Sequence, residues 1–415
     1  MTVSEPGGAA AAGGAAALDS FATGEAGARQ LIETLARLER LPCSPGEREA
    51  AAWIARRLEA AGCDHVALEE EPARGRYAPT IAGLGVAGAI ASALCVAGRR
   101  TAALLISLGG IAAVVDEAQN GPRLLRRALY PRRTTTNVVA RAGDADAPRT
   151  LLVLAHHDAH PTGRLYDQSL LIAAHRHVPG LLARLKTSLP QWWFGCSGAL
   201  LTVYAALTGR RRPAAVGIAL NLVGAASMAE VARAPVTPGA NDNLSGVAGL
   251  LRLAELLRER PLPRTRVLLV SCGAEEALQE GVRAFIARHG HELDPRSTRV
   301  INLETIGSPR LIMLEGEGPI WMEDYADPAF RDEVERLARE NGIALERGFR
   351  ARASTDSVIP SRAGHATATL TSITAWGALA NYHLPTDTPE NVDHATLESA
   401  ARLAYAVAAA ADAPH

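Results

Sequence analysis

The sequence predicts an α/β protein with one mixed, mostly parallel sheet, helices on both faces, and two insertions that each form an apolar helical hairpin. Short strand-like runs alternate with helical segments over most of the chain, which is typical of a sheet covered on both faces. Four long apolar stretches interrupt this alternation in two pairs. The 415 residues, 48% hydrophobic and 21% charged, exclude a disordered or collagen-like chain and accommodate one domain with large insertions.

The expected elements follow from local patterning. Residues 1–25 are rich in Ala and Gly and are expected to form a disordered tail, so that the domain spans 26–415. Helical spacing begins at Leu31, and a second helix is expected after Ser44, with Glu47 completing a capping box. Further helices are expected over 245–259, 278–289, 328–341 and 394–411. Strands are expected over 65–69, 137–141, 151–155, 267–271, 300–303, 311–314 and 367–370.

The four apolar stretches are long enough to suggest a membrane. Residues 77–98 and 188–209 are each 22 residues without a charge, and 101–115 and 213–229 add 15 and 17 more. Arginines separate the members of each pair, so each pair is expected to form a hairpin within the insertions 76–132 and 160–236. A bilayer core needs about 20 apolar residues per helix. We therefore expect membrane association; a soluble four-helix cap or a dimerisation element is the alternative.

Charge and cysteine content restrict the partners and the compartment. Lys+Arg 43 against Asp+Glu 44 gives a net charge of −1, which offers no general attraction for nucleic acid. The five cysteines are widely spaced, so a disulfide framework or a cysteine zinc site is disfavoured and a reducing compartment is expected. No secretory signal is recognisable at the start. The catalytic domain is therefore expected in the cytoplasm, either held at a membrane or soluble; an oligomer is compatible with both.

Acidic and histidine side chains follow apolar runs or glycine turns in five short segments. Open α/β sheets bind ligands where their strands end. A lone H-x-D or Glu-Glu is a weak signal, but five such segments in this order are a strong one. They are 155–158 (Ala-His-His-Asp), 239–243 (Gly-Ala-Asn-Asp-Asn), 273–276 (Gly-Ala-Glu-Glu), 302–304 (Asn-Leu-Glu) and 381–383 (Asn-Tyr-His).

These residue types suit a pair of zinc ions. Two neighbouring zincs need imidazole and carboxylate ligands, one carboxylate able to bridge them, and open positions for water and substrate. Two histidines and three carboxylates meet that requirement and leave one acid over as a base. Cysteine is not needed, and Cys272 is expected to be packed rather than ligating.

With these segments the chain resembles the co-catalytic di-zinc exopeptidases, the family of aminopeptidase Y, bacterial leucyl aminopeptidases and glutamate carboxypeptidase. The resemblance covers nearly the whole chain outside the hairpins and includes 355–364 and the histidine loop 383–388. It implies the zinc exopeptidase fold, two zinc ions and a peptide substrate. The metal ligands it implies are His156, Asp242 as the bridging carboxylate, Glu276, Glu304 and His383. The catalytic residues it implies are Glu275 as general base, Asp158 orienting the His156 imidazole, and Tyr382 near the developing oxyanion.

The chain departs from the family pattern at three places. Glu304 stands where the family usually has Asp, and Ser357 stands where it commonly has His. Asp158 and Asp242 are 84 residues apart, where the usual interval is little over ten, because the second hairpin lies between them. At the start of this insertion are His157, His160, His175 and His177, which we expect to be solvated or hydrogen-bonded rather than ligands.

The activity that the resemblance implies is that of a zinc-dependent exopeptidase, most simply an aminopeptidase. A dizinc-bound water would attack the peptide carbonyl after losing a proton to Glu275. Glutaminyl cyclisation or another amide reaction on the same scaffold is an alternative. A non-catalytic, receptor-like scaffold is an alternative of another class, which the retained ligand positions disfavour.

The insertions are expected to emerge near the metal site. If the strands at 65–69, 137–141 and 151–155 are sequential antiparallel neighbours, the first and the third run in the same direction. Each of these two strands is followed by one insertion. Both hairpins would then leave the sheet at the edge that bears His156 and Asp158, and the apolar bundle would stand over or beside the metal site.

Overall fold

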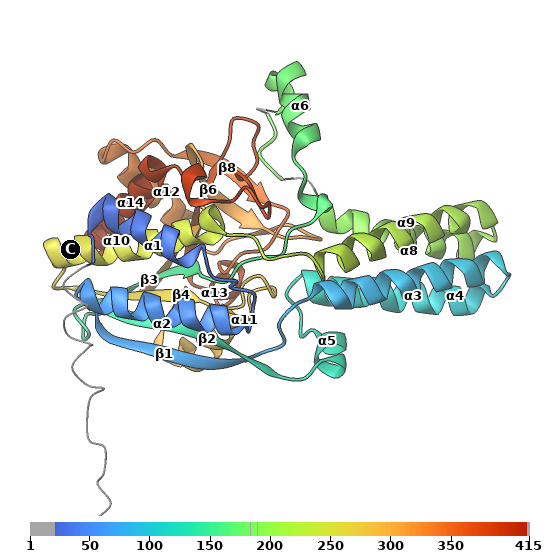
Figure 1. Cartoon of the computed structure of the whole chain (residues 1–415), viewed down its shortest axis with the longest axis horizontal. Helices are drawn as coiled ribbons and strands as arrows, with labels where there is room; N and C mark the ends of the chain where they lie inside the picture. Colours follow the sequence, from blue (N-terminus) through green and yellow to red (C-terminus); the bar gives the residue numbers. More distant parts are fainter. Residues whose placement is uncertain (1–20, 183, 189, 413–415) are drawn as a thin grey trace, which may run out of the picture.

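The computed structural model describes residues 21–182, 184–188 and 190–412, so most of the expected tail lies outside the described residues. A bundle of four helices projects from one end of an α/β domain (Figure 1). Helix α1 (Gly24–Leu35) begins before the helical spacing noted at Leu31, and the Phe21 ring packs edge-on against Trp53. Ordered structure in the described part therefore starts slightly before the expected domain boundary.

Nine strands form one mixed sheet within the described residues, in the order β1-β2-β4-β3-β5-β9-β6-β7, with β8 paired to β6. Strands β4, β3, β5 and β9 are parallel to one another and form its centre. Strands β1, β2 and β6 add antiparallel pairs on either side. The strands are β1 (Asp64–Ala73), β2 (Arg133–Gly143), β3 (Arg149–His156), β4 (Thr265–Cys272), β5 (Thr298–Glu304), β6 (Arg310–Glu317), β7 (Glu323–Asp324), β8 (Glu346–Ala351) and β9 (Ala366–Ile373).

The expected pairing of β2 with β3 is wrong, because β4 lies between them. Val138 of β2 is opposite Ser271 of β4, and His156 of β3 is opposite Cys272 on the other side of β4. The run from Leu151 to Ala155 is fully buried, as expected of a strand with parallel neighbours on both sides. Because β1 is antiparallel to β2, and β2 to β4, β1 and β3 still run in the same direction. Both insertions therefore leave the sheet at the predicted edge.

Helices cover both faces of the sheet, as the sequence predicts. Leu151 and Val153 point into a core shared with α1, α2 (Pro45–Ala60), α10 (Ser245–Glu259), α12 (Pro328–Glu340) and α14 (His394–Asp412). Leu152 and Leu154 point to the opposite face, against α11 (Glu280–His289) and α13 (Val358–Arg362). Ser44 caps α2 by accepting the Glu47 N–H, while the Glu47 carboxylate accepts the N–H of Cys43 rather than that of Ser44. The single turns are η2 (Arg164–Tyr166), η3 (Ala240–Leu244), η4 (Gly290–Glu292) and η5 (Pro389–Asn391).

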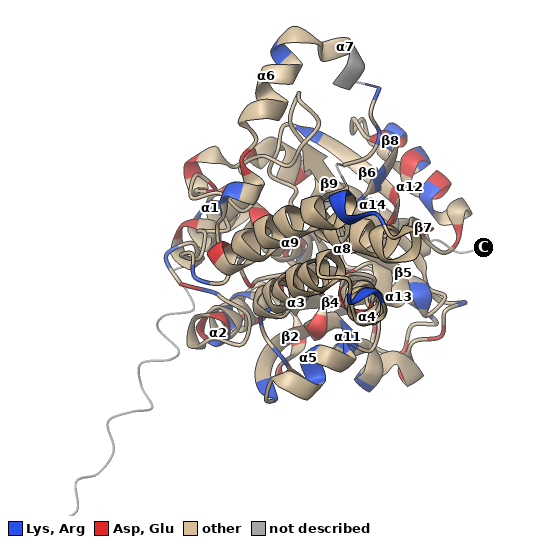
Figure 2. Cartoon of the chain, turned by 90° about the vertical axis from the view of Figure 1, so that its right-hand side faces the viewer, with Lys and Arg blue, Asp and Glu red and all other residues tan. Residues whose placement is uncertain are grey.

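The two insertions form the four-helix bundle from two hairpins, α3 (Ala78–Val96) with α4 (Arg100–Ala118) and α8 (Gln191–Thr208) with α9 (Arg211–Val231). Glycines make the close contacts: a Cβ at Gly85 would lie 2.9 Å from the Cβ of Ala225. Inside, Ser92 Oγ lies 2.6 Å from Thr202 Oγ1 and accepts from Asn221 Nδ2. Viewed from its free end, the bundle shows arginines at the turns and almost no charge along the helices (Figure 2).

The bundle exposes apolar side chains over much of its outer surface. Val86, Ile90 and Leu105 are 48%, 54% and 66% exposed. Three helices, Ala78–Val96, Arg100–Ala118 and Arg211–Val231, are long and apolar enough to cross a membrane, and Gly195–Thr208 is a shorter apolar helix. The insertions also contain three short helices that the sequence did not predict, α5 (Leu124–Leu129), α6 (Ser169–His177) and α7 (Pro179–Leu182).

Candidate metal centre

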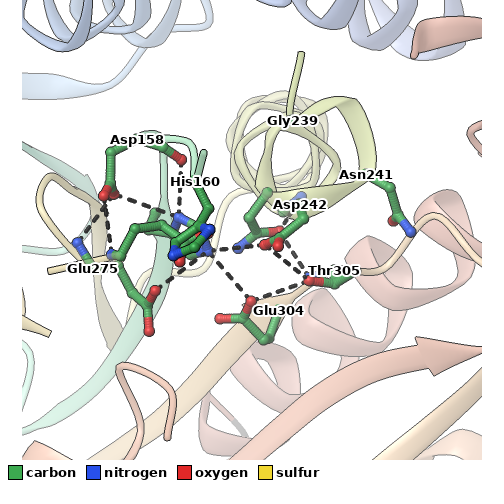
Figure 3. Close-up of polar contacts among 12 residues, drawn as sticks. Asp158, His160, Gly239, Asn241, Asp242, Glu275, Glu304 and Thr305 are labelled. Atoms are coloured by element: carbon green, nitrogen blue, oxygen red, sulfur yellow. Dashed lines mark hydrogen bonds and ion pairs between the residues drawn. The ribbon is translucent and has the colours of Figure 1, made fainter. Parts of the chain in front are cut away.

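The five predicted segments meet at one edge of the sheet. His156 ends β3, Glu304 ends β5, and Glu275 and Glu276 follow β4. Because these strands are parallel, their carboxyl ends lie side by side. Asp242 comes from η3, just before α10, and His383 from the loop after β9. Figure 3 shows Asp242, Glu275 and Glu304 converging from these separate elements.

Two sets of ligand atoms share Asp242. In the first set, His156 Nε2 lies 3.3 Å from Asp242 Oδ1 and 3.3 Å from Glu304 Oε1. In the second set, His383 Nε2 lies 3.1 Å from Asp242 Oδ2 and 3.0 Å from Glu276 Oε1. The two oxygens of Asp242 therefore face different sets, as a bridging carboxylate requires.

The donor atoms fit zinc in type and spacing. Zinc binds imidazole nitrogen and carboxylate oxygen at about 2.0–2.2 Å. Tetrahedral ligands at that range lie about 3.3 Å from one another, close to the separations of 3.0–3.3 Å in both sets. The first set, His156, Asp242 and Glu304, is buried, so its donors are largely desolvated.

The electrostatics of the site also favour cations. Burial raises the pKa of Glu276 to about 7 and holds the pKa of Glu275 well above its usual value. Burial lowers the pKa of His383, but Glu276 and Asp242 outweigh it and raise that pKa to about 9. The carboxylates are thus crowded enough to share protons with the imidazoles in the absence of a metal, and a bound cation would relieve this crowding.

Asp158 and Asp387 hold the backbone of the ligand loops. The Asp158 carboxylate accepts the N–H groups of Glu275 and Glu276, both at 3.0 Å, and one of its oxygens is 3.5 Å from His156 Nδ1. Asp387 accepts the N–H groups of Asn241 and Asp242 at 2.7 and 3.0 Å. His156 Nδ1 is nearer to the Asp158 carbonyl oxygen, at 3.2 Å, so the Asp158 carboxylate mainly holds the loop of the predicted base.

His160 is hydrogen-bonded, as one of the expected alternatives states, and it lies at the site. It is buried, forms a potential ligand group with Glu276 and His383, and stacks on the His383 ring at 3.9 Å between centroids. Its Nε2 lies 3.2 Å from the Tyr77 hydroxyl. The only indication in the sequence that His160 lies near the site is its position two residues after Asp158. His157 instead pairs with Ser271 Oγ, and His175 and His177 lie on α6.

Tyr382 lies beside the second ligand set. Its ring stacks on His383 with centroids 3.8 Å apart, and it lines the cavity above the site together with Glu275. Glu275 Oε1 accepts from Gln279 Nε2 at 2.5 Å, and its other oxygen is 3.9 Å from His156 Nε2. The predicted base is therefore oriented toward the centre from the side of the cavity.

Buried arginines fasten the surrounding segments to one another. Arg126 forms an ion pair with Glu117 at 3.0 Å and donates to the carbonyl groups of Gly75 and Ala277. Because Glu117 belongs to α4 and Ala277 follows the predicted base, the bundle is tied to the loop that carries Glu275. No sequence pattern singled out this arginine.

Arg40 is a second such residue, and it is fully buried. Its guanidinium donates to the carbonyls of Leu35, His157 and Pro238 at 2.5, 2.8 and 2.9 Å. We expect Arg40→Met to lower the free energy of unfolding by about 3 kcal/mol, because several buried carbonyls lose a charged donor. Arg37→Met, at an exposed position of the same segment, should change it by less than about 0.5 kcal/mol in the same denaturant titration. Equal effects of the two substitutions would contradict this role for Arg40.

Comparisons with known proteins identify a family match and a partial relative. Residues 217–408 match the family model of peptidase family M28. The uncharacterized protein YfbL of Escherichia coli (strain K12) is 49% identical over 72 residues, which are 17% of this chain and 22% of that protein. The match therefore spans about a fifth of the relative's length.

Solved structures share the fold at low sequence identity. A Bacteroides thetaiotaomicron glutaminyl cyclase has a TM-score of 0.54 at 14% identity, covering 93% of this chain and 97% of its own. A Zn-dependent exopeptidase from Parabacteroides distasonis has a TM-score of 0.52 at 13% identity, covering 93% and 98%. An aminopeptidase from Aneurinibacillus sp. strain AM-1 has a TM-score of 0.50 at 14% identity, covering 93% of both chains.

The fold and the family match together support a zinc exopeptidase scaffold. The match to family M28 over residues 217–408 agrees with the resemblance to zinc exopeptidases noted in the sequence. This match supports a zinc metallo-exopeptidase, and the glutaminyl cyclase among the structural neighbours fits the alternative.

Proposed function

We propose that the protein is a membrane-associated aminopeptidase with two zinc ions. The observation that carries this proposal is the Asp242 carboxylate, which turns one oxygen toward each of two ligand sets. His156 and Glu304 would complete the first site, and Glu276 and His383 the second. Zinc, when bound there, supplies a Lewis acid for the carbonyl and lowers the pKa of water.

The protein's own residues would handle the proton. Glu275 would accept the proton of the attacking water and return it to the leaving amine. Gln279 fixes one oxygen of Glu275, and Asp158 fixes its backbone N–H. Tyr382, beside His383, would donate a hydrogen bond to the oxygen of the substrate carbonyl as charge develops on it.

A free amine on the substrate is the first test of this assignment. The acids around the centre, among them Glu275 and Glu304, favour a positively charged α-ammonium group. We expect an N-acetylated peptide to be cleaved at least about 100-fold less efficiently, in kcat/KM, than the same peptide with a free amine. Liquid chromatography of the products measures both rates. Equal rates would exclude an aminopeptidase and favour a carboxypeptidase or another amidohydrolase.

Liquid chromatography of the products also tests the alternative reaction, glutaminyl cyclisation. A peptide that begins with Gln would lose ammonia and keep its length if the protein were a cyclase, but would lose its first residue if it were an aminopeptidase. The fold shared with glutaminyl cyclases supports including this peptide in the panel.

Membrane association is the second part of the proposal, and the bundle supports it. Three helices have the length and composition of membrane spans, and their outer faces carry apolar side chains. Exposed apolar patches beyond a few hundred Å² mark partners or membranes. We expect the full-length protein to sediment with membranes and to resist extraction by high salt and by alkaline carbonate. Recovery of the intact chain as a monodisperse soluble protein without detergent would contradict this prediction.

A further inference from the structure

The metal centre opens into a cavity that continues between the helices of the bundle. The cavity has a volume of about 150 Å³, and Glu275, Tyr382 and His383 line one end of it. Residues of α3, α4, α8 and α9 line much of the remainder, and η2, the loop after Glu276 and residues 352–354 complete it. The lining extends from Tyr77, the N-cap residue of α3, to Gly88 within that helix, which at 1.5 Å per residue is about 16 Å.

This depth distinguishes the cavity from a subsite for one amino-acid side chain. A side chain attached next to a scissile bond at His383 would not reach Gly88 or Asn221, which line the far part. The main chain of a longer peptide is also poorly suited, because its N–H and C=O groups would need partners among apolar helices. A hydrocarbon chain needs none. A protein cavity of about 150 Å³ is large enough to hold benzene, about six carbons.

The helices that line the cavity leave open space beside several of their glycines. Added Cβ atoms at Gly110, Gly195 and Gly224 would meet no atom within 4 Å, so the helices are not closed against one another there. Two lining residues on neighbouring helices, Ile106 and Gly195, are also exposed. A chain can therefore enter sideways, from the surroundings of the apolar helices, while its polar end reaches the metal centre.

From this geometry we propose that the substrate is an amphiphilic amide, whose single alkyl chain occupies the bundle cavity while its amide lies at the metal centre. This inference rests on the proposed amide hydrolysis and narrows its substrate class. Ser107 lines the cavity, and its buried hydroxyl has no hydrogen-bond partner in the protein. An alkyl chain would not supply one. Ser107→Ala should therefore retain or increase the preference for long chains.

The test is a chain-length series on the full-length protein in mixed micelles. The substrates are 2-aminoalkanoic acid amides with unbranched side chains of one to ten carbons, and alaninamides N-alkylated over the same range on the leaving amine. In at least one series kcat/KM should rise about threefold to fourfold per methylene, over about six carbons. Saturation at the length of a leucine side chain in both series would overturn the proposal.

Two adjacent glycines of α4 provide matched variants. Gly110 lines the cavity, whereas Gly109 is exposed and outside it, and an added Cβ meets no atom within 4 Å at either position. Gly110→Leu should lower the ratio of kcat/KM between the ten-carbon and one-carbon substrates by at least about tenfold. Gly109→Leu should leave this ratio unchanged. Gly224→Leu on α9 repeats the test if Gly110→Leu does not fold, with exposed Gly83→Leu as its control.

A binding measurement separates this inference from the proposed activity. Trp192 lines the cavity, so a bromoalkyl amide should quench tryptophan fluorescence, and Trp192→Phe should remove that quenching. Quenching that Gly110→Leu abolishes and Gly109→Leu retains supports the cavity even if no amide is hydrolysed. Hydrolysis of short amides without quenching or chain-length dependence would leave the aminopeptidase assignment intact and overturn the alkyl-chain proposal.

Discussion

Replacement of Glu275 by Gln is expected to lower kcat by about 10³-fold or more while the zinc content stays at the wild-type value. The amide has nearly the same size as the carboxylate but cannot accept a proton, and general-base catalysis contributes about 10²–10⁴-fold. Glu275 belongs to neither of the two ligand sets, since its nearer oxygen is 3.9 Å from His156 Nε2. Metal analysis of the purified variant, together with its turnover, measures both parts of the prediction.

The neighbouring residue is the matched control. Glu276 Oε1 is 3.0 Å from His383 Nε2 in the second set, so Glu276→Gln should lower the zinc content as well as kcat. A Glu275→Gln variant that loses zinc, beside a Glu276→Gln variant that keeps it, would show that the two roles are exchanged. A wild-type rate in Glu275→Gln would exclude the proposed mechanism.

Much of the candidate site could be predicted because several of its residues follow strands. His156, Glu275 and Glu304 stand directly at or after apolar runs that become β3, β4 and β5, and parallel strands bring such positions together. The same reasoning located the bundle over the site. The position of β4 between β2 and β3 does not change this prediction, because the prediction depends only on the relative direction of β1 and β3.

The residues that support the site could not be predicted in the same way. Arg40 and Arg126 are buried by contacts with carbonyl groups from distant segments, and carbonyl contacts leave no pattern in the sequence. The sequence leaves His160 either solvated or hydrogen-bonded, because its partners, Tyr77 and His383, lie 83 and 223 positions away. Strand β8 was missed because its residues Glu346–Ala351 form no apolar run. In each case long-range packing, rather than local patterning, determines the structure.

Replacement of Asp242 by Ala is expected to have the largest effect on metal content. Each oxygen of Asp242 is 3.1–3.3 Å from the imidazole of a different ligand set, so the substitution removes one donor from both proposed sites. We expect the zinc content to fall from about two ions to less than one, and kcat to fall by more than about 10³-fold, since the Lewis acid and the activated water both depend on the ions.

Single-set variants make this prediction specific to a bridging residue. His383→Ala removes a donor from the second set alone and should leave about one zinc bound, because His156, Asp242 and Glu304 still surround the first site. Asp242→Asn keeps the size of the side chain but removes the charge, and should resemble Asp242→Ala in zinc content if charge holds the ions together. Zinc titration by inductively coupled plasma mass spectrometry distinguishes these cases. If Asp242→Ala and His383→Ala bind equal amounts of zinc, Asp242 does not bridge two ions, and the centre holds a single metal.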